Sequence, residues 1–147
     1  MSERLESRIT VAALIEREGR FLMVEERDGS AIVYNQPAGH LERDETLAQA
    51  VVREVHDETG HRCEPEHIVG IYLWPSRAGP TILRVAFACR THGAGDGPSD
   101  PDILGLHWLT RAELDSKALR SPLVTRCADD YLAGRRYPLG LLCELAP

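Results

Sequence analysis

The segment that decides the fold runs from Gly39 to Gly60 and reads GHLERDETLAQAVVREVHDETG. Its second half, Leu47 to Thr59, has apolar residues at the spacing of an α-helix. Thr46, with Gln49 three positions later, matches a capping box at the start of that helix, and Gly60 is typical of the residue that ends one. We therefore predict a loop, a helix over residues 47–59 and a second loop.

One face of this predicted helix carries three carboxylates in its last turns. At about 100° per residue, an arc of roughly 120° holds Leu47, Ala50, Val51, Glu54, Asp57 and Glu58. Because the first turns of the face are apolar, the carboxylates project from a packed surface, where like charges repel strongly. Each then needs a proton, a cationic partner or a metal ion. Oxygen ligands favour Mg²⁺ or Mn²⁺ over zinc. The alternative is a solvated acidic helix end neutralised by Arg53, although acidic residues there oppose the helix dipole.

The spacing of the fixed residues in this segment resembles the Nudix box. Gly39 is followed by five residues, Glu45, seven residues and then Arg53–Gly60, which reads REVHDETG. The family pattern is Gly, five residues, Glu, seven residues, then Arg-Glu-apolar-x-Glu-Glu-x-Gly-apolar. This chain departs from it at Asp57, where Glu is usual, and at His61, where an apolar residue is usual. A match of so many residues at fixed spacing is a specific signal.

The resemblance implies a hydrolase of phosphoanhydride bonds that uses Mg²⁺, with Mn²⁺ as a substitute. The metal ligands that it implies are the carboxylates of Glu54, Asp57 and Glu58 and the backbone carbonyl of Ala38. Gly39 would let the backbone approach metal and phosphate closely. Glu45 and Arg53 would pair and hold the loop onto the helix. Asp57 has a side chain one methylene shorter than the usual Glu, so it would reach the metal through water.

In such enzymes water attacks phosphorus while cations offset charge on the bridging and leaving oxygens. Glu54 is one candidate for the general base, and a carboxylate of the later loop is the other. Asp100 and Asp102 are better placed than Asp96, because they come just before the next predicted strand. Turn formation beside two prolines is the alternative role for each of these aspartates. The candidate catalytic residues are Glu54, Glu58 and Asp102.

The rest of the chain alternates apolar runs with turn signals. Strands are predicted at residues 9–15, 21–25, 67–73, 81–89 and 104–109. Residues 27–45 and 91–102 read as two long loops. A capping box predicts a short helix after Thr110, and Ser121-Pro122 predicts a last helix that ends at Gly134. Strands on both sides of a central helix indicate an α/β fold, with a mixed β-sheet sandwiched between helices and a loop–helix–loop motif.

Length and composition are those of an ordinary globular protein. The 147 residues are expected to form one Nudix hydrolase domain, residues 1–147. Four scattered cysteines without a Cys-x-x-Cys pair argue against structural zinc and disulfides, and no run is long enough to span a bilayer. The net charge of −6 argues against nucleic-acid or anionic-membrane partners, but not against an anionic small molecule bound through cations. We expect a cytoplasmic monomer.

Outside the box, three stretches are similar to the NudJ-type phosphatases of the same family. They are Tyr34–Glu42, Leu119–Val124 and Arg136–Leu139. The likeness implies a substrate among the nucleoside di- and triphosphates or the pyrimidine diphosphate precursor of thiamin, with release of inorganic phosphate. Tyr34 is a candidate to stack on a base, and Arg84 to bind phosphate. The structural alternatives are that Tyr34 covers the edge of the core and that Arg84 forms a surface ion pair.

Two other functions remain open from the sequence. A Nudix pyrophosphohydrolase would cleave a dinucleotide, a sugar nucleotide or an oxidised nucleotide internally. A non-catalytic Nudix module would bind a nucleotide without turning it over. The intact Glu54 and Glu58 argue against the binding module, whereas the departures at Asp57 and His61 keep it open.

Overall fold

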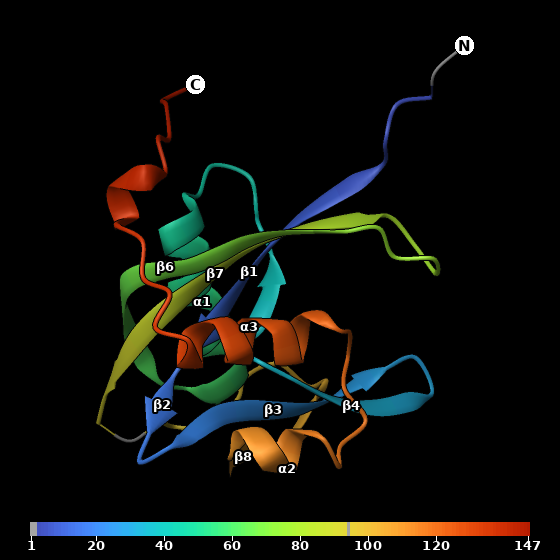
Figure 1. Ribbon diagram of the computed structural model, residues 1–147, viewed down its shortest axis with the longest axis vertical. Helices are drawn as coiled ribbons and strands as arrows, with labels where there is room; N and C mark the ends of the chain where they lie inside the picture. Colours follow the sequence, from blue (N-terminus) through green and yellow to red (C-terminus); the bar gives the residue numbers. More distant parts are fainter. Residues whose placement is uncertain (1–2, 94) are drawn as a thin grey trace.

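The computed structural model describes residues 3–93 and 95–147 as two four-stranded sheets with helices around them (Figure 1). The strands are β1 (Ser7–Leu14), β2 (Glu16–Arg17), β3 (Arg20–Asp28), β4 (Ala31–Asn35), β5 (Ala38–His40), β6 (Arg62–Trp74), β7 (Thr81–His92) and β8 (Ile103–Leu109). The helices are α1 (Leu47–Thr59), α2 (Arg111–Leu114), α3 (Leu123–Leu132) and the 3₁₀ turn η1 (Leu139–Leu141). The predicted α/β class with mixed strand directions is confirmed.

The first sheet has the order β5-β1-β7-β6 and is mixed. Strands β1 and β7 run parallel, in register from Ser7–Thr81 to Leu14–Ala88, while β5 and β6 pair antiparallel with them. The last five residues of β1 are all buried. This continuous apolar run is typical of a strand that is covered on both faces.

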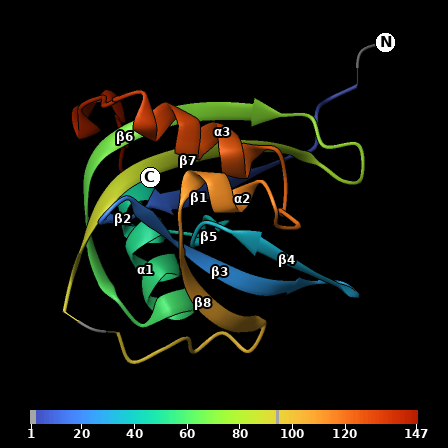
Figure 2. The same ribbon diagram turned by 60° about the horizontal axis from the view of Figure 1, so that its bottom comes forward.

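Helices cover both faces of this first sheet (Figures 1 and 2). On one face, Val11 and Phe87 belong to a core cluster with Val51 and Val55 of α1. On the other face, Ala12 and its neighbours pack with residues of α3. The helix that carries the carboxylates is therefore held directly against the central strands.

The second sheet is built around β3. Strands β2, β4 and β8 all pair antiparallel with it. Alternate residues of β3 join different core clusters, Phe21 and Met23 one and Leu22 the other, so the second sheet closes over both parts of the core.

Helix α1 begins and ends as the sequence predicts. The Thr46 hydroxyl accepts from the Gln49 N–H at 3.1 Å, the Gln49 side chain accepts from the Thr46 N–H at 2.9 Å, and Gly60 adopts φ +75°. Glu144, near the C-terminus, also accepts from the Leu47 N–H at 2.9 Å. A carboxylate at a helix N-terminus is favourable, so the end of the chain stabilises this helix.

The prediction of one long loop over residues 27–45 is wrong. This stretch holds β4 and β5, which pair with β3 and β1. The free edge of β4 is also covered, because Tyr34 exchanges backbone hydrogen bonds with Ala118 and Arg120. Strands this short, next to turn residues, have too few positions to show an alternating pattern, and distant segments stabilise them.

The remaining predicted elements are present with shifted ends. β7 continues to His92, so the second loop is shorter than predicted. Helix α3 begins at Leu123 after Pro122, and the Ser121 hydroxyl accepts from the Leu123 N–H at 3.2 Å. Within residues 3–93 and 95–147, no helix is both long and apolar enough to cross a lipid bilayer.

Candidate active site

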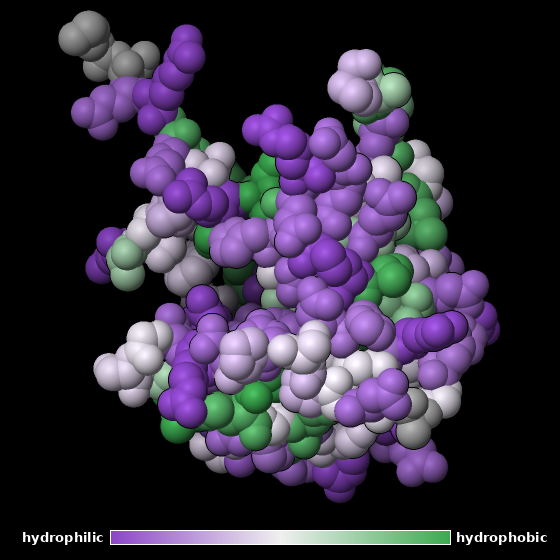
Figure 3. Space-filling view, turned by 180° about the vertical axis from the view of Figure 1, so that it is seen from behind, coloured by the Kyte–Doolittle hydropathy of each residue, from purple (hydrophilic) through white to green (hydrophobic). Residues whose placement is uncertain are grey.

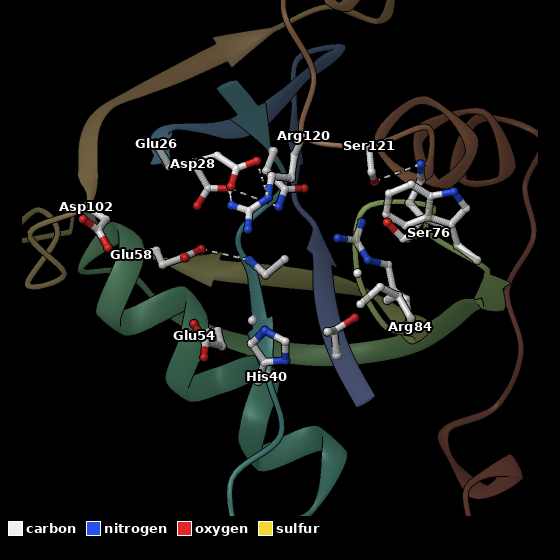
Figure 4. A pocket seen from close by; sticks show the side chains of 18 of the residues that line it. Glu26, Asp28, His40, Glu54, Glu58, Ser76, Arg84, Asp102, Arg120 and Ser121 are labelled. Atoms are coloured by element: carbon white, nitrogen blue, oxygen red, sulfur yellow. Dashed lines mark hydrogen bonds and ion pairs between the residues drawn. The ribbon is translucent and has the colours of Figure 1, made fainter. Parts of the chain in front are cut away.

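A cavity of about 670 Å³ opens between the two sheets. Figure 3 shows the surface hollowed between the β6–β7 hairpin and the β3–β4 hairpin. The cavity is lined by residues of α1, β3 and the sheet around β1 and β7, and by the segments that precede β8 and α3 (Figure 4). Carboxylates gather at one end of it, around α1 and β3.

Glu58 is the most deeply buried of these carboxylates, with 4% of its surface exposed. Its Oε1 accepts from the Ala38 N–H at 2.9 Å. Burial raises the pKa of Glu58 to about 9, and the negative charges of Glu26, Glu54 and Asp100 act in the same direction. Near neutral pH and without a cation, this carboxyl group therefore keeps its proton.

Glu54 lies one helical turn earlier and is paired with Arg53. Its Oε1 is 2.7 Å from Arg53 Nη1, yet burial still raises the pKa of Glu54. Arg53 also binds Glu45 with two nitrogens, at 2.7 and 3.0 Å, and donates to the His40 carbonyl at 2.9 Å. This fork fixes the loop before the helix onto the helix, as the family resemblance implies.

Gly39 lies directly opposite the Glu54 carboxyl group. A Cβ at this position would overlap the carboxyl carbon and both oxygens of Glu54. The backbone of β5 therefore approaches the carboxylate more closely than a side chain would allow. The carbonyl of the preceding Ala38 lies in the same segment, beside the group that Glu58 accepts from.

Glu26 of β3 is a site residue that the sequence analysis missed. It is 7% exposed, accepts from Asn35 Nδ2 at 3.3 Å and forms an ion pair with Arg120 at 3.1 Å. Burial raises its pKa despite the nearby guanidinium. The available signal was alternation along β3, because Glu26 has the same parity as the buried Val24.

The loop before β8 brings two aspartates to the cavity. Asp100 lies close enough to raise the pKa of both Glu54 and Glu58, and its Oδ1 also accepts from the Asp102 N–H at 2.9 Å. Asp102 lines the cavity as well. The Asp57 carbonyl accepts from the Ser99 N–H at 2.9 Å and from the Asp100 N–H at 3.1 Å, so α1 holds this loop in place.

The Asp57 side chain itself is not among the groups that line the cavity. It is 43% exposed and lies 3.8 Å from Arg53 Nη1. The structure therefore brings together Glu54, Glu58, Asp102 and Ala38 among the expected site residues and leaves Asp57 at the rim, where its main-chain carbonyl anchors the loop.

The donors around Glu58 fit a hard divalent cation, since buried carboxylates and a backbone carbonyl are its preferred ligands. In the described part of the chain, no three acidic, histidine or cysteine side chains converge as a finished cation site. As they stand, these carboxylates are satisfied by other groups: Arg53 pairs with Glu54, and burial keeps Glu58 protonated. The fit lies in the type of donor, since carboxyl and carbonyl oxygens converge at this end of the cavity.

The two candidate substrate residues lie in different places. Tyr34 does not line the cavity: its ring packs 5.3 Å from His107 and beneath Lys117, at the edge of the core. Adjacent residues of a strand face opposite sides, so Asn35 reaches the cavity and Tyr34 does not. Arg84 does line it and is only 5% exposed. Among the described residues it is therefore not part of a surface ion pair, which was its alternative role.

Known proteins resemble this chain in both sequence and structure. The NUDIX domain family matches residues 6–127. The chain belongs to the Nudix hydrolase family. The phosphatase NudJ of Escherichia coli K12 is 40% identical to this Nudix hydrolase over 141 residues, which cover 91% of this chain and 89% of that protein. The protein of the same name from Shigella flexneri matches equally.

Solved structures agree with this assignment. A NUDIX hydrolase from Nitrosomonas europaea is 43% identical, with a TM-score of 0.91 over 95% of this chain and 98% of that one. The E. coli ORF135 protein shares the fold at 24% identity, with a TM-score of 0.74 over 89% and 92% of the two chains. This Nudix hydrolase therefore acts on phosphoanhydride bonds of small phosphorylated substrates, and divalent metals are the general cofactors of its family.

Proposed function

We propose that the protein is a Mg²⁺-dependent phosphatase that releases inorganic phosphate from nucleoside tri- and diphosphates, with Mn²⁺ as a substitute cofactor. A pyrimidine diphosphate of the thiamin-precursor type is a further candidate substrate. The observation that carries the proposal is Glu58, a buried carboxyl group surrounded by three other carboxylates at one end of a cavity. Likeness to the phosphatase NudJ over most of both chains supports the choice of substrate class.

Each proposed role is assigned to an atom of the site. Glu54, Glu58 and the Ala38 carbonyl would hold the cations, with Asp57 as an outer ligand. Bound cations would offset charge on the bridging and leaving oxygens of the phosphoanhydride. Water attacks the terminal phosphorus, the bond to the bridging oxygen breaks, and the proton of the water passes to a carboxylate. Glu54 and Asp102 are the candidate bases for that proton.

Residues that the structure adds have supporting roles in this proposal. Asp100 and Glu26 contribute to the negative potential at the carboxylate end, which favours cations. Arg120 holds Glu26 at 3.1 Å and Asp28 at 3.4 Å, so it limits repulsion among them while no cation is bound. We further propose that residues 1–147 act as one Nudix domain and as a monomer.

The test is a panel of nucleoside tri- and diphosphates, sugar nucleotides and dinucleotides, incubated with Mg²⁺ and analysed by chromatography of every product. The proposal expects inorganic phosphate as the first small product from a nucleoside triphosphate. Pyrophosphate with nucleoside monophosphate from the outset, or internal cleavage of sugar nucleotides or dinucleotides alone, would assign the protein to the pyrophosphohydrolases instead. Glu58→Gln serves as the inactive control for contaminating phosphatases.

A further inference from the structure

Arg84 is a buried cation without an acidic partner. It lies on β7, 5% exposed, and within residues 3–93 and 95–147 it forms no salt bridge at 4.0 Å or less. Its Nη1 donates to Gln36 Oε1 at 3.3 Å, and in that part of the chain its Nε has no hydrogen-bond partner. A buried charge normally has a counter-charge, because desolvation is otherwise too costly. Arg84 therefore has a positive charge that is available to an anion.

The guanidinium is nevertheless held in a fixed place. Gln36 is buried, and its Nε2 donates to the Val124 carbonyl at 2.7 Å, which turns its oxygen toward Arg84. The Cys127 thiol is a second neutral neighbour of the guanidinium. Neutral groups therefore orient Arg84 and leave its positive charge uncompensated. Figure 4 shows the guanidinium pointing from β7 into the cavity.

A second unpartnered donor lies beside Arg84. Thr10 of β1 is its direct partner in the parallel register of β1 and β7, so the two side chains leave the sheet from adjacent strands, about 5 Å apart. Thr10 is 7% exposed and lines the cavity, and among the described residues its Oγ1 has no hydrogen-bond partner. A guanidinium and a hydroxyl group in this arrangement can donate together to the oxygens of one anion.

The other cations of the cavity differ from Arg84. Arg120 is occupied by Glu26 and Asp28, and Arg27 is exposed to solvent. Arg84 lies away from the cluster around Glu58, as Figure 4 shows. The cavity therefore has an acidic end suited to cations and a separate buried position suited to an anion.

We infer that Arg84 and Thr10 form a phosphate subsite, which binds oxygens of the substrate's phosphate chain that the carboxylate end does not hold. The free Nε–H and the outer edge of the guanidinium match the spacing of two phosphate oxygens, and the Thr10 hydroxyl supplies a further donor. The identity of the anion as a phosphate chain rests on the proposed function. Its binding at this position rests on the geometry of Arg84.

The first experiment observes the Arg84 Nε–H directly. Inorganic phosphate is titrated into ¹⁵N-labelled full-length protein in chelator at constant ionic strength, and the arginine Nε–H resonances are followed. Arg84→Lys removes one resonance and thereby assigns it. The inference expects this resonance to move with a saturating dependence on phosphate, while that of the exposed Arg77 stays in place. An Arg84 resonance that does not respond overturns the inference.

Variants then measure the contribution to affinity. Arg84→Gln should weaken phosphate binding by roughly tenfold or more, the range for a hydrogen bond to a charged group. The matched control is Arg77→Gln in the β6–β7 hairpin, which should bind as the wild type does. Thr10→Val keeps the side-chain shape and should weaken binding a few-fold. If Arg84→Gln does not fold, Arg84→Lys takes its place, since it keeps the charge and loses the planar fork.

The outcomes separate this inference from the proposed function. Phosphate binding in chelator requires no turnover, so release of pyrophosphate from triphosphates would contradict the proposed function and leave the subsite intact. Wild-type phosphate affinity in folded Arg84→Gln and Thr10→Val would overturn the subsite and leave the phosphatase proposal intact. The same applies if these variants weaken binding of a phosphate-free nucleoside only, because the position would then bind the base.

Discussion

At the scale of single residues, the site depends on carboxylates in surroundings that disfavour their charge. Glu58 combines deep burial with one backbone hydrogen bond, from the Ala38 N–H. Its neighbours are acidic, so desolvation and, to a smaller extent, repulsion raise its pKa to about 9. A residue that served only the fold would gain nothing from such surroundings, whereas a cation ligand would.

Glu58→Gln should separate activity from stability. The amide oxygen can still accept from the Ala38 N–H, but a neutral amide is a much poorer ligand for a hard cation. We expect kcat to fall roughly 100-fold or more, equivalent to about 1.36 kcal/mol per decade. The melting temperature in chelator should hold or rise, because the wild type must take up a proton at Glu58 when it folds at neutral pH, whereas the amide needs none. Near wild-type activity, or a badly destabilised metal-free variant, would make Glu58 a structural residue.

We expect the metal-free wild type and Glu58→Gln to differ in how their stability depends on pH. The pKa of Glu58 is raised from 4.5 to about 9 in the folded state, which therefore binds this proton more tightly than the unfolded state does. The metal-free wild type should lose stability as pH rises from about 5 toward 9. Glu58→Gln has no proton to lose there, so its melting temperature in chelator should fall less over that range. Parallel pH profiles for the two proteins would contradict this.

Gly39→Ala should affect the site before the fold. The added methyl group would overlap the Glu54 carboxyl group, the mobile end of a long side chain, so Glu54 can swing away at small cost. We expect a fall in kcat of at least about tenfold, since correct positioning of reacting groups is worth that much. The melting temperature should change little. Gly140→Ala, where a Cβ meets no described residue within 4 Å, is the control and should keep full activity.

At the scale of elements, the ends of α1 were predictable and much of its surroundings was not. Thr46, Gln49 and Gly60 act locally, through hydrogen bonds within a few residues, so their positions in the sequence define the helix. β4 and β5 depend on partners elsewhere in the chain, and residues 27–45 therefore read as a loop. Glu26 shares the parity of the buried Val24, but its partners Asn35 and Arg120 come from other segments, and the sequence alone does not place them beside it.

Gly60→Ala should weaken the junction between α1 and the loop before β8. Gly60 has φ +75°, and a Cβ there would meet the backbone of Gly97, which cannot move aside as a side chain does. We expect a loss of roughly 1–2 kcal/mol in unfolding free energy from the left-handed conformation, and a further loss from the contact. Gly134→Ala, at φ +81° with no atom of the described residues within 4 Å of the new Cβ, isolates the conformational part. Equal losses in the two variants would show that the contact is relieved elsewhere.

At the scale of the whole molecule, the cavity lies where the two sheets meet. Its acidic end comes from α1 and β3, which belong to different layers, and the chain as a whole carries a net charge of −6. An anionic substrate is repelled by such a surface unless cations lie between the two sets of charge. The family could be predicted from one segment of sequence, but this meeting of layers required the structure.

Divalent cations should therefore be needed for activity and should stabilise the protein. Mg²⁺ or Mn²⁺ should support turnover, and excess chelator should abolish it. Because the ion binds the folded state, the melting temperature should rise with its concentration, by the equivalent of about 2.7 kcal/mol at 100 times Kd. Calorimetry with and without chelator measures this. Full activity in metal-free buffer would contradict the mechanism, and calcium, a hard cation of different size, is the useful comparison.

Because the loop before β8 is hydrogen-bonded to the Asp57 carbonyl, its opening can be followed by hydrogen exchange. Ser99 and Asp100 lie outside helices and strands, yet both of their amides donate to the end of α1. Their hydrogens can exchange with solvent deuterium only when the loop detaches from the helix. We expect these two amides to exchange far more slowly than the amides of the exposed β6–β7 turn at residues 77–79 on the opposite rim. Mass spectrometry or NMR would then measure how often this loop opens, from the exchange rates of these two amide hydrogens.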